Sequence, residues 1–285
     1  PPRSTLFPYT TLFRSMRCHN GGYANSPIID PAGHGRHKLD DTGGQCVGCH
    51  MPQTTYMERH PRRDHSFTIP DPLLTRELGI PNACNRCHAD KDVEWSIQAV
   101  EQWYGDRMER PSRQRARGVA AARRGETVGR DRMLGLLAGD EVPYWKAVAA
   151  GLLDPWIAEP PVQEALFGAL DHPDPLVRAA AVSTLEPLVA LPEGRVIEAL
   201  RRRLDDPMRS VRFRAAWALR ATLELESLAG RELRYVLDFN ADQPGGQAQK
   251  GAFALARNQP LTALEHYGKA VRWDPFSAGL HNELA

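Results

Sequence analysis

The chain has 285 residues, 42% of them apolar, and a formal net charge of +1. A charge so close to zero gives no electrostatic reason to expect binding to nucleic acid or to anionic lipids. No apolar run is long enough to span a membrane, so we expect no membrane span. The length leaves room for two or three domains, and the composition changes along the chain.

The N-terminal part has an unusual composition. Residues 1–15 resemble a translated sequencing adapter and show no periodicity that fits the remainder, so we expect them to be a non-native leader. From Met16 to His88 large aliphatic residues are sparse, while Gly, Pro, His and Cys are common. Such a stretch buries too little apolar surface to fold on its own side chains. We therefore expect disulfides, a metal or a large cofactor to order it.

All five cysteines lie in this part, and each cysteine pair is followed directly by a histidine. Residues 46–50 and 84–88 form two Cys-x-x-Cys-His motifs, and Cys18 is followed by His19. Two thiols at this spacing can each add to one vinyl group of haem, and the next residue then lies under the iron as its proximal imidazole. The motifs therefore predict two complete haem c sites. Their anchors are Cys46, Cys49, Cys84 and Cys87, and their proximal iron ligands are His50 and His88.

The odd cysteine predicts a third, incomplete site. With cysteine in place of Ser15, residues 15–19 would form another complete motif. Because Ser15 ends the suspected leader, we expect this haem site to be partly truncated, with Cys18 as its remaining anchor and His19 as its proximal ligand.

Two other uses of the cysteines compete with haem. A zinc site built from the four paired cysteines is chemically reasonable, and disulfides suit a secreted chain. Both leave the histidines that follow the cysteines without a role. A thioredoxin-like redox motif would need a βαβ context, which the sequence does not show.

A six-coordinate haem iron needs a second axial ligand, and four further histidines lie among the motifs. Histidine is usually scattered and exposed, so this density favours ligation. His60, which precedes Pro61, equally suits an exposed turn. The four residues are His34, His37, His60 and His65.

Three runs in this region resemble multihaem cytochromes related to cytochrome c-554 and the cytochrome c nitrite reductases. They are QCVGCHMP at 45–52, RRDHSF at 62–67 and PNACNRCH at 81–88. The resemblance implies that His65 is a distal haem ligand and that His37 or His34 is another. It does not settle activity, because a catalytic haem of that superfamily keeps an open iron position, and no feature of this sequence indicates one.

One helix is predicted directly after the last motif. Apolar residues recur at helical spacing over 93–104, and Gly105 follows as a stop. Trp95 and Trp103 on this helix either cover a haem edge or pack between domains. Residues 106–117 are rich in arginine, which is typical of a solvated linker.

An internal repeat with a 34-residue offset follows. Residues 162–166 (VQEAL) match 196–200 (VIEAL), and the Val-Arg pair at 177–178 matches the one at 211–212. Each unit has the pattern of a helix, a short Asp/Pro turn and a second helix. The pattern resembles HEAT repeats, which stack into a continuous core with a concave face and bind partners more often than they catalyse.

The C-terminal part resembles a tetratricopeptide repeat. The positions that carry this resemblance are Gly251, Ala263, Tyr267, Ala270 and Pro275. Residues 277–285 begin a further helix, so we expect the repeat region to be truncated and the native protein to continue.

These observations predict an all-α fold in four parts. They are the leader (1–15), a multihaem cytochrome c domain with few regular elements (16–110), HEAT-like repeats (111–225) and a tetratricopeptide-like region (226–285). The predicted function is electron transfer by covalently bound haems, with redox partner proteins docking on the repeats. The alternatives are a multihaem oxidoreductase acting on a small nitrogen or sulfur compound, and a zinc-stabilised repeat adaptor. Because haem c is attached outside the cytoplasm, we expect a periplasmic or otherwise exported protein.

Overall fold

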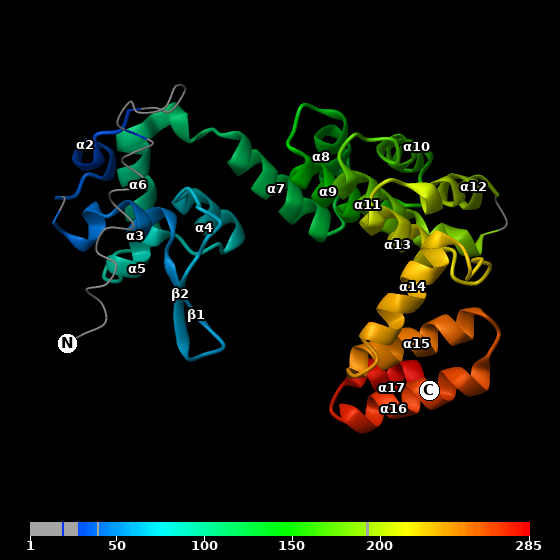
Figure 1. Cartoon of the computed structure of the whole chain (residues 1–285). Helices are drawn as coiled ribbons and strands as arrows, with labels where there is room; N and C mark the ends of the chain where they lie inside the picture. The colour runs from blue at the N-terminus through cyan, green and yellow to red at the C-terminus, as the bar shows by residue number, and fades with distance from the viewer. Residues whose placement is uncertain (1–18, 20–27, 39, 192–193) are drawn as a thin grey trace. The chain divides into compact units, whose positions relative to one another are not determined.

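The chain divides into two compact units, Pro1–Arg117 and Gly118–Ala285. The computed structural model describes residues 19, 28–38, 40–191 and 194–285 (Figure 1). The predicted leader and Cys18 therefore lie outside the described residues. In the part of the chain that is described, no helix is both long and apolar enough to cross a membrane.

The first unit contains short helices and one β-hairpin. Strand β1 (Gln53–Tyr56) pairs antiparallel with β2 (His60–Arg63), and both strands are largely exposed. The helices and 3-10 turns, in chain order, are α2 (Pro31–Gly35), η2 (Thr42–Gly44), α3 (Cys46–His50), α4 (Pro72–Leu78), α5 (Ala83–Cys87), α6 (Val93–Tyr104), η3 (Gly105–Met108) and the start of α7 (Pro111–Arg123). The sequence analysis did not predict the hairpin.

The helix predicted over 93–104 is present as α6 with the same bounds. Asp92 caps it by accepting a hydrogen bond from the Trp95 amide at 2.8 Å. The apolar core of this unit is small. Its buried large side chains, among the described residues, are Val47, Leu74, Ile97, Val100 and Met108. A core of this size supports the expectation that a further group orders the unit.

The arginine-rich stretch at 106–117 is not the solvated linker that its composition predicted. Most of it forms η3 and α7. Arg113 is only 6% exposed, because it donates two hydrogen bonds of 2.8 and 2.9 Å to the Asp71 carboxylate. Arg117 bonds to Glu77 in the same bidentate way. These pairs attach the start of α7 to α4, through partners about 40 residues away that local composition does not reveal.

The second unit consists of successive helices (Figure 1). After α7 they are α8 (Thr127–Ala138), α9 (Pro143–Leu152), η4 (Asp154–Trp156), α10 (Pro160–Ala169), α11 (Pro175–Leu185), η5 (Glu186–Ala190), α12 (Gly194–Arg202), η6 (Arg203–Asp205), α13 (Arg209–Ala218), α14 (Leu228–Phe239), α15 (Pro244–Ala256), α16 (Pro260–Trp273) and α17 (Ala278–Leu284). Several of them begin with proline, which is tolerated there because the first residues of a helix have no intrahelical acceptor for an N–H group. One continuous core joins α8 to α13. Its fully buried members include Met133, Leu166, Val182, Leu200 and Val211.

The 34-residue repeat recurs in the hydrogen bonds of this unit. Arg178 donates to the carbonyl oxygens six and five residues before it, both at 2.9 Å. Arg212 donates to the carbonyl oxygens at the same positions before it, at 2.8 and 3.0 Å. Arg178 also forms a bidentate pair with Asp206, in the turn of the next repeat. The repeated arginine therefore binds the turn of its own repeat, and Arg178 also links its repeat to the next one through Asp206.

The C-terminal helices α15 and α16 form a helical hairpin (Figure 1). The helices approach closely at Gly251, where a Cβ would lie 2.9 Å from the Tyr267 ring. Both positions belong to the predicted tetratricopeptide pattern, and the assignment of 226–285 to that family stays a prediction. The mostly helical fold class is confirmed, whereas the haem-organised character of 16–110 stays a prediction.

Candidate functional site

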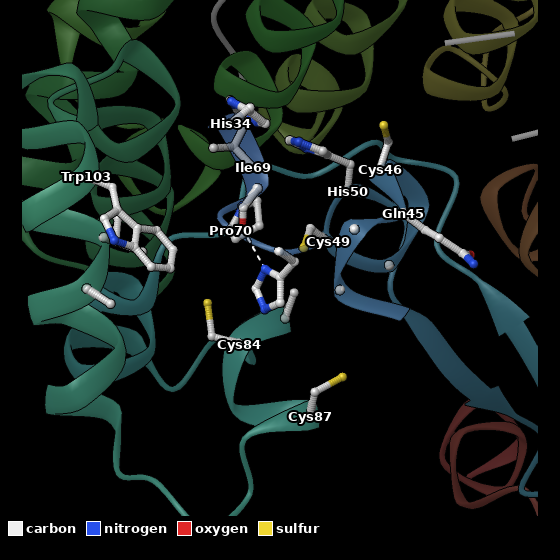
Figure 2. Close-up of a pocket in the computed structure, with 18 of the residues that line it drawn as sticks. His34, Gln45, Cys46, Cys49, His50, Ile69, Pro70, Cys84, Cys87 and Trp103 are labelled. Atoms are coloured by element: carbon white, nitrogen blue, oxygen red, sulfur yellow. Dashed lines mark hydrogen bonds between the residues drawn. The ribbon is translucent and has the colours of Figure 1, made fainter. Parts of the chain in front are cut away.

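The first unit contains a cavity of about 350 Å³ onto which both cysteine motifs open. Its wall comes from α2, η2, α3, the segment 67–70, α5 and α6 (Figure 2). The volume lies in the range of small-ligand and cofactor sites, about 300–1,000 Å³. The histidines that line it are His19, His34, His37, His50 and His88. The cavity thus brings together five of the six histidines predicted as iron ligands.

The first motif occupies α3, a single short helix. Val47 of the motif is buried, and Arg63 of β2 donates hydrogen bonds to the Val47 and Met51 carbonyl oxygens at 2.9 and 3.2 Å. The Val47 oxygen also accepts from the Met51 amide at 3.1 Å, so Arg63 adds a side-chain bond from the hairpin to the end of α3. His50 ends α3 and donates from Nδ1 to the Thr68 carbonyl oxygen at 2.8 Å. This bond leaves Nε2 available as a metal ligand.

The second motif occupies α5 and is held by the side chain of its second residue, Asn85. Asn82 caps the helix by accepting from the Asn85 amide at 3.1 Å. The Asn85 side chain accepts from Asn82 Nδ2 and Ser96 Oγ, both at 2.9 Å. It also donates to the carbonyl oxygens of Lys91 and Asp92 at 3.0 and 3.1 Å. The motif is therefore tied to the beginning of α6 by a side-chain amide whose donors and acceptor are all used.

The four described cysteines are free thiols. Burial, followed by the neighbouring Cys87, raises the pKa of Cys49. Burial, followed by Cys49, raises the pKa of Cys84. The thiols of the two motifs therefore lie within electrostatic reach of each other, and burial disfavours the thiolate form of Cys49 and Cys84.

Within the described ranges, no three His, Cys, Asp or Glu side chains converge as a ligand set for a metal ion. A tetrahedral zinc site needs four such side chains, and the four-cysteine zinc alternative stays a prediction. A haem iron differs, because the porphyrin supplies four of its ligands and the protein only the axial ones.

Four of the cavity histidines form two pairs. The ring centres of His34 and His50 are 6.0 Å apart, with 13° between the ring planes. Those of His37 and His88 are 6.1 Å apart, with 39° between the planes. Two imidazoles bound to opposite faces of one iron have ring centres about 6 Å apart, because each metal–nitrogen bond is about 2.0 Å and each ring centre lies about 1 Å behind its nitrogen. Each pair joins one motif histidine to one upstream candidate.

A hydrogen bond also orients one of the upstream rings. His37 donates from Nδ1 to the Gly35 carbonyl oxygen at 2.5 Å, as His50 does to Thr68. Metal-bound histidines usually make this outer bond, which sets the tautomer and directs Nε2 to the metal. The ring-centre separations of the two pairs and the outer hydrogen bonds of His37 and His50 are therefore compatible with axial ligation of haem iron, and the haem groups themselves stay a prediction.

The chain geometry around α2 brings the two upstream histidines to the cavity. Asp30 caps α2 by accepting a backbone hydrogen bond at 3.0 Å, and Arg36 ends it in the left-handed conformation with φ of 56°. His34 lies before this reversal and His37 lies after it. A Cβ on Gly43 would lie 2.7 Å from the His37 Cγ, so a larger residue at position 43 would displace the His37 ring. Partial burial, followed by nearby positive charge, lowers the pKa of His34.

Aromatic side chains lie against both pairs. Trp95 packs on His88 with ring centres 4.9 Å apart, and Phe67 packs on His50 at 5.1 Å. Trp103 of α6 also lines the cavity (Figure 2). Both tryptophans therefore line the cavity, and their predicted place at a haem edge stays a prediction.

Some predicted residues lie elsewhere. His65 is exposed and does not line the cavity, so its predicted role as a distal ligand gains no support from its position and stays a prediction. His60 lies in the exposed strand β2. His19 lines the cavity, whereas its companion Cys18 is outside the described residues.

The sequence analysis assigned no site role to Tyr104 or Arg110. The Tyr104 hydroxyl donates to the His34 carbonyl oxygen, and Arg110 lines the cavity. No local pattern could have found them, because Tyr104 and His34 are 70 residues apart.

The comparison with known proteins concerns the second unit, which contains the 34-residue sequence repeat and the hydrogen bonds that recur with it. Residues 131–222 match the family model of HEAT repeats. The match begins within α8 and ends shortly after α13, which confirms the resemblance to HEAT repeats for most of the region predicted to contain them. No curated protein and no solved structure matches the chain. The cavity lies outside the residues that match.

Proposed function

We propose that the protein carries electrons through two c-type haems bound in the cavity of its first unit, and that its HEAT repeats dock a redox partner. One observation carries the proposal. The ring centre of each motif histidine lies at a distance from that of a second histidine that suits two ligands of one iron, 6.0 Å in one pair and 6.1 Å in the other. Haem supplies a reversible one-electron couple when it is bound.

The chain's own residues bind and orient the two groups. The thiols of each motif would anchor one porphyrin, and the histidine after them would bind its iron. His34 would supply the second iron ligand of the haem bound by His50, and His37 that of the haem bound by His88. The Asn85 hydrogen bonds hold the second motif in place, which keeps its ligand oriented.

The arrangement favours a carrier over an enzyme. A haem that binds and converts a small nitrogen or sulfur compound needs an open axial position on its iron. In each pair the second histidine would fill that position, since its ring centre lies 6.0 or 6.1 Å from that of the motif histidine. The zinc-stabilised adaptor has less support, since the described thiols do not converge with a third metal ligand.

The location and the partner follow from the two units. Haem c is attached outside the cytoplasm, so the proposal implies a periplasmic or otherwise exported protein. HEAT repeats commonly bind other proteins over an extended surface. A redox protein is the partner that this proposal requires.

The test is to produce the full chain together with the cytochrome c maturation machinery. Intact mass and a pyridine haemochrome spectrum should show at least two covalently attached haems. The double variant Cys46→Ser/Cys49→Ser should lose one haem, and Cys84→Ser/Cys87→Ser should lose another. A colourless protein without an added tetrapyrrole would overturn the proposal.

The ligand pairing is tested by spin state. The haems of the two complete motifs should be low-spin. His34→Ala and His37→Ala should each convert one of them to a high-spin form, and His65→Ala serves as the matched control with no change. A conversion by His65→Ala, with none by the other two variants, would replace the proposed pairs.

A further inference from the structure

Three arginines gather beside one of the histidine pairs. Arg110 lines the cavity, and its Nε donates to the Arg107 carbonyl oxygen at 2.6 Å. The Arg107 guanidinium lies 5.5 Å from the centre of the Tyr104 ring, which is itself 5.7 Å from the His34 ring. Arg36, at the end of α2, lies within electrostatic reach of the same tyrosine. These three residues are called the arginine cluster below.

The charges of the arginine cluster are not neutralised by the carboxylates of the described residues. Arg107 donates to the Trp103 carbonyl oxygen at 3.3 Å, and no member forms an ion pair with a described Asp or Glu. The arginines that follow in α7 differ, since Arg113 is paired with Asp71 and Arg117 with Glu77. Of the three, Arg110 is the one that lines the cavity. A guanidinium group without a carboxylate partner suits a carboxylate ligand, which it binds in bidentate geometry.

We propose that the arginine cluster binds the propionate groups of the haem held by His34 and His50, and that it raises the reduction potential of this haem above that of the other. The proposal rests on the proposed function. Haem carries its two propionates on the half opposite its two vinyl groups. Vinyl groups bonded to Cys46 and Cys49 therefore direct the propionates away from α3. In Figure 2, the two histidines lie between Cys46 and Trp103 of α6, the helix that leads into the arginine cluster.

The sign of the effect follows from charge. Reduction of ferric haem adds one electron and lowers the charge at the iron by one, with no bond formed or broken. Arginine stays protonated at any working pH, so its positive charge favours the reduced form. Close to His88 in the chain, Lys91 forms an ion pair with Asp90 at 3.1 Å, so these two opposite charges largely cancel. The haem of the first motif should therefore hold the electron when one of the two is reduced.

The experiment is a spectroelectrochemical titration of the matured full chain. Arg107→Gln and Arg110→Gln should each lower the higher midpoint potential, by up to a tenfold change in the reduction equilibrium, which is about 59 mV for one electron. Arg110→Lys should keep most of the potential because it keeps the charge. The matched control is Arg62→Gln, which removes an exposed arginine that also lies over a tyrosine ring, 4.7 Å away, but outside the cavity.

A second variant assigns the shifted potential to one haem. Cys46→Ser/Cys49→Ser removes the first haem, so the midpoint potential that the arginine variants lower must be the one that this variant lacks. Intact mass shows that each arginine variant still carries its haems. If both midpoint potentials stay unchanged, or if the surviving haem is the one that shifts, the inference is wrong while haem binding stands. If no haem is attached in the unsubstituted chain, the proposed function itself fails.

Discussion

Replacing Arg178 tests how the HEAT repeats are held together. Its side chain and that of Asp206 are 9% and 2% exposed, and two hydrogen bonds of 2.8 Å join them. Arg178→Ala leaves a charged carboxylate buried without its main partner, and it also removes both bonds to the turn carbonyls. Breaking a buried pair in this way costs about 3–5 kcal/mol. That is a large share of the roughly 5–15 kcal/mol that stabilises a typical folded domain.

The matched control is an exposed pair in the same unit. Arg195 bonds to Glu164 between neighbouring repeats, but both side chains are 60% exposed. Water screens this pair, so Arg195→Ala should cost about 1 kcal/mol or less. Urea unfolding of the full chain, followed by circular dichroism, gives both values. A midpoint shift at unchanged slope reports stability alone.

The outcome separates two accounts of the repeat. If burial of the pair matters, Arg178→Ala lowers the melting temperature of this unit by about 6–20 °C, at about 2–4 °C per kcal/mol. Equal losses for Arg178→Ala and Arg195→Ala would refute the reasoning. The repeated Val-Arg pair would then be a sequence feature without the structural role assigned to it.

Three further predictions follow from single contacts. Gly43→Ala should displace the His37 ring and convert one haem to a high-spin form, measured by its absorption and paramagnetic resonance spectra; an unchanged spectrum would exclude His37 as a ligand. Asn85→Ala removes four side-chain hydrogen bonds and should reduce haem attachment at the second motif alone, as read by intact mass, and equal loss at both motifs would contradict it. Burial by itself raises the pKa of Asp206, but hydrogen bonds from the Arg178 side chain and the Met208 amide outweigh it, so the pKa lies below its usual value. The folded state therefore gains stability from the ionised carboxylate above about pH 4 and loses it as the pH falls through the lowered pKa. The stability difference between the wild type and Asp206→Asn should shrink only in that acid range, and a difference independent of pH would contradict the assignment.

Local patterns predicted a large part of the fold. The helix at 93–104 was predicted with its bounds, because its apolar spacing and its glycine stop are both local signals. The HEAT repeats were predicted from the 34-residue offset, since each repeat contacts mainly its neighbours and so keeps its own pattern. The hairpin β1–β2 was missed, because its exposed strands lack the alternation of apolar residues that marks a half-buried strand.

The linker prediction failed for a different reason. Composition at 106–117 reports only the number of charges, not their partners. The buried position of Arg113 depends on Asp71, 42 residues away, which composition cannot reveal. The same holds for the candidate site. The motif histidines could be recognised from the sequence because they follow their cysteines directly, whereas the pairing of His34 and His37 with them, and the position of Arg110, could not.

The sequence by itself determined the chemistry of the site and the class of the scaffold. Thiols two residues apart and the histidine after them are adjacent in the chain, so no folding is needed to recognise them, and the 34-residue repeat is equally visible in one dimension. The tertiary structure alone decided which histidines face each other and where the arginines lie. It brought His34 and His37, but not His65, to the cavity, because distances across a cavity arise only when segments far apart in the chain pack together.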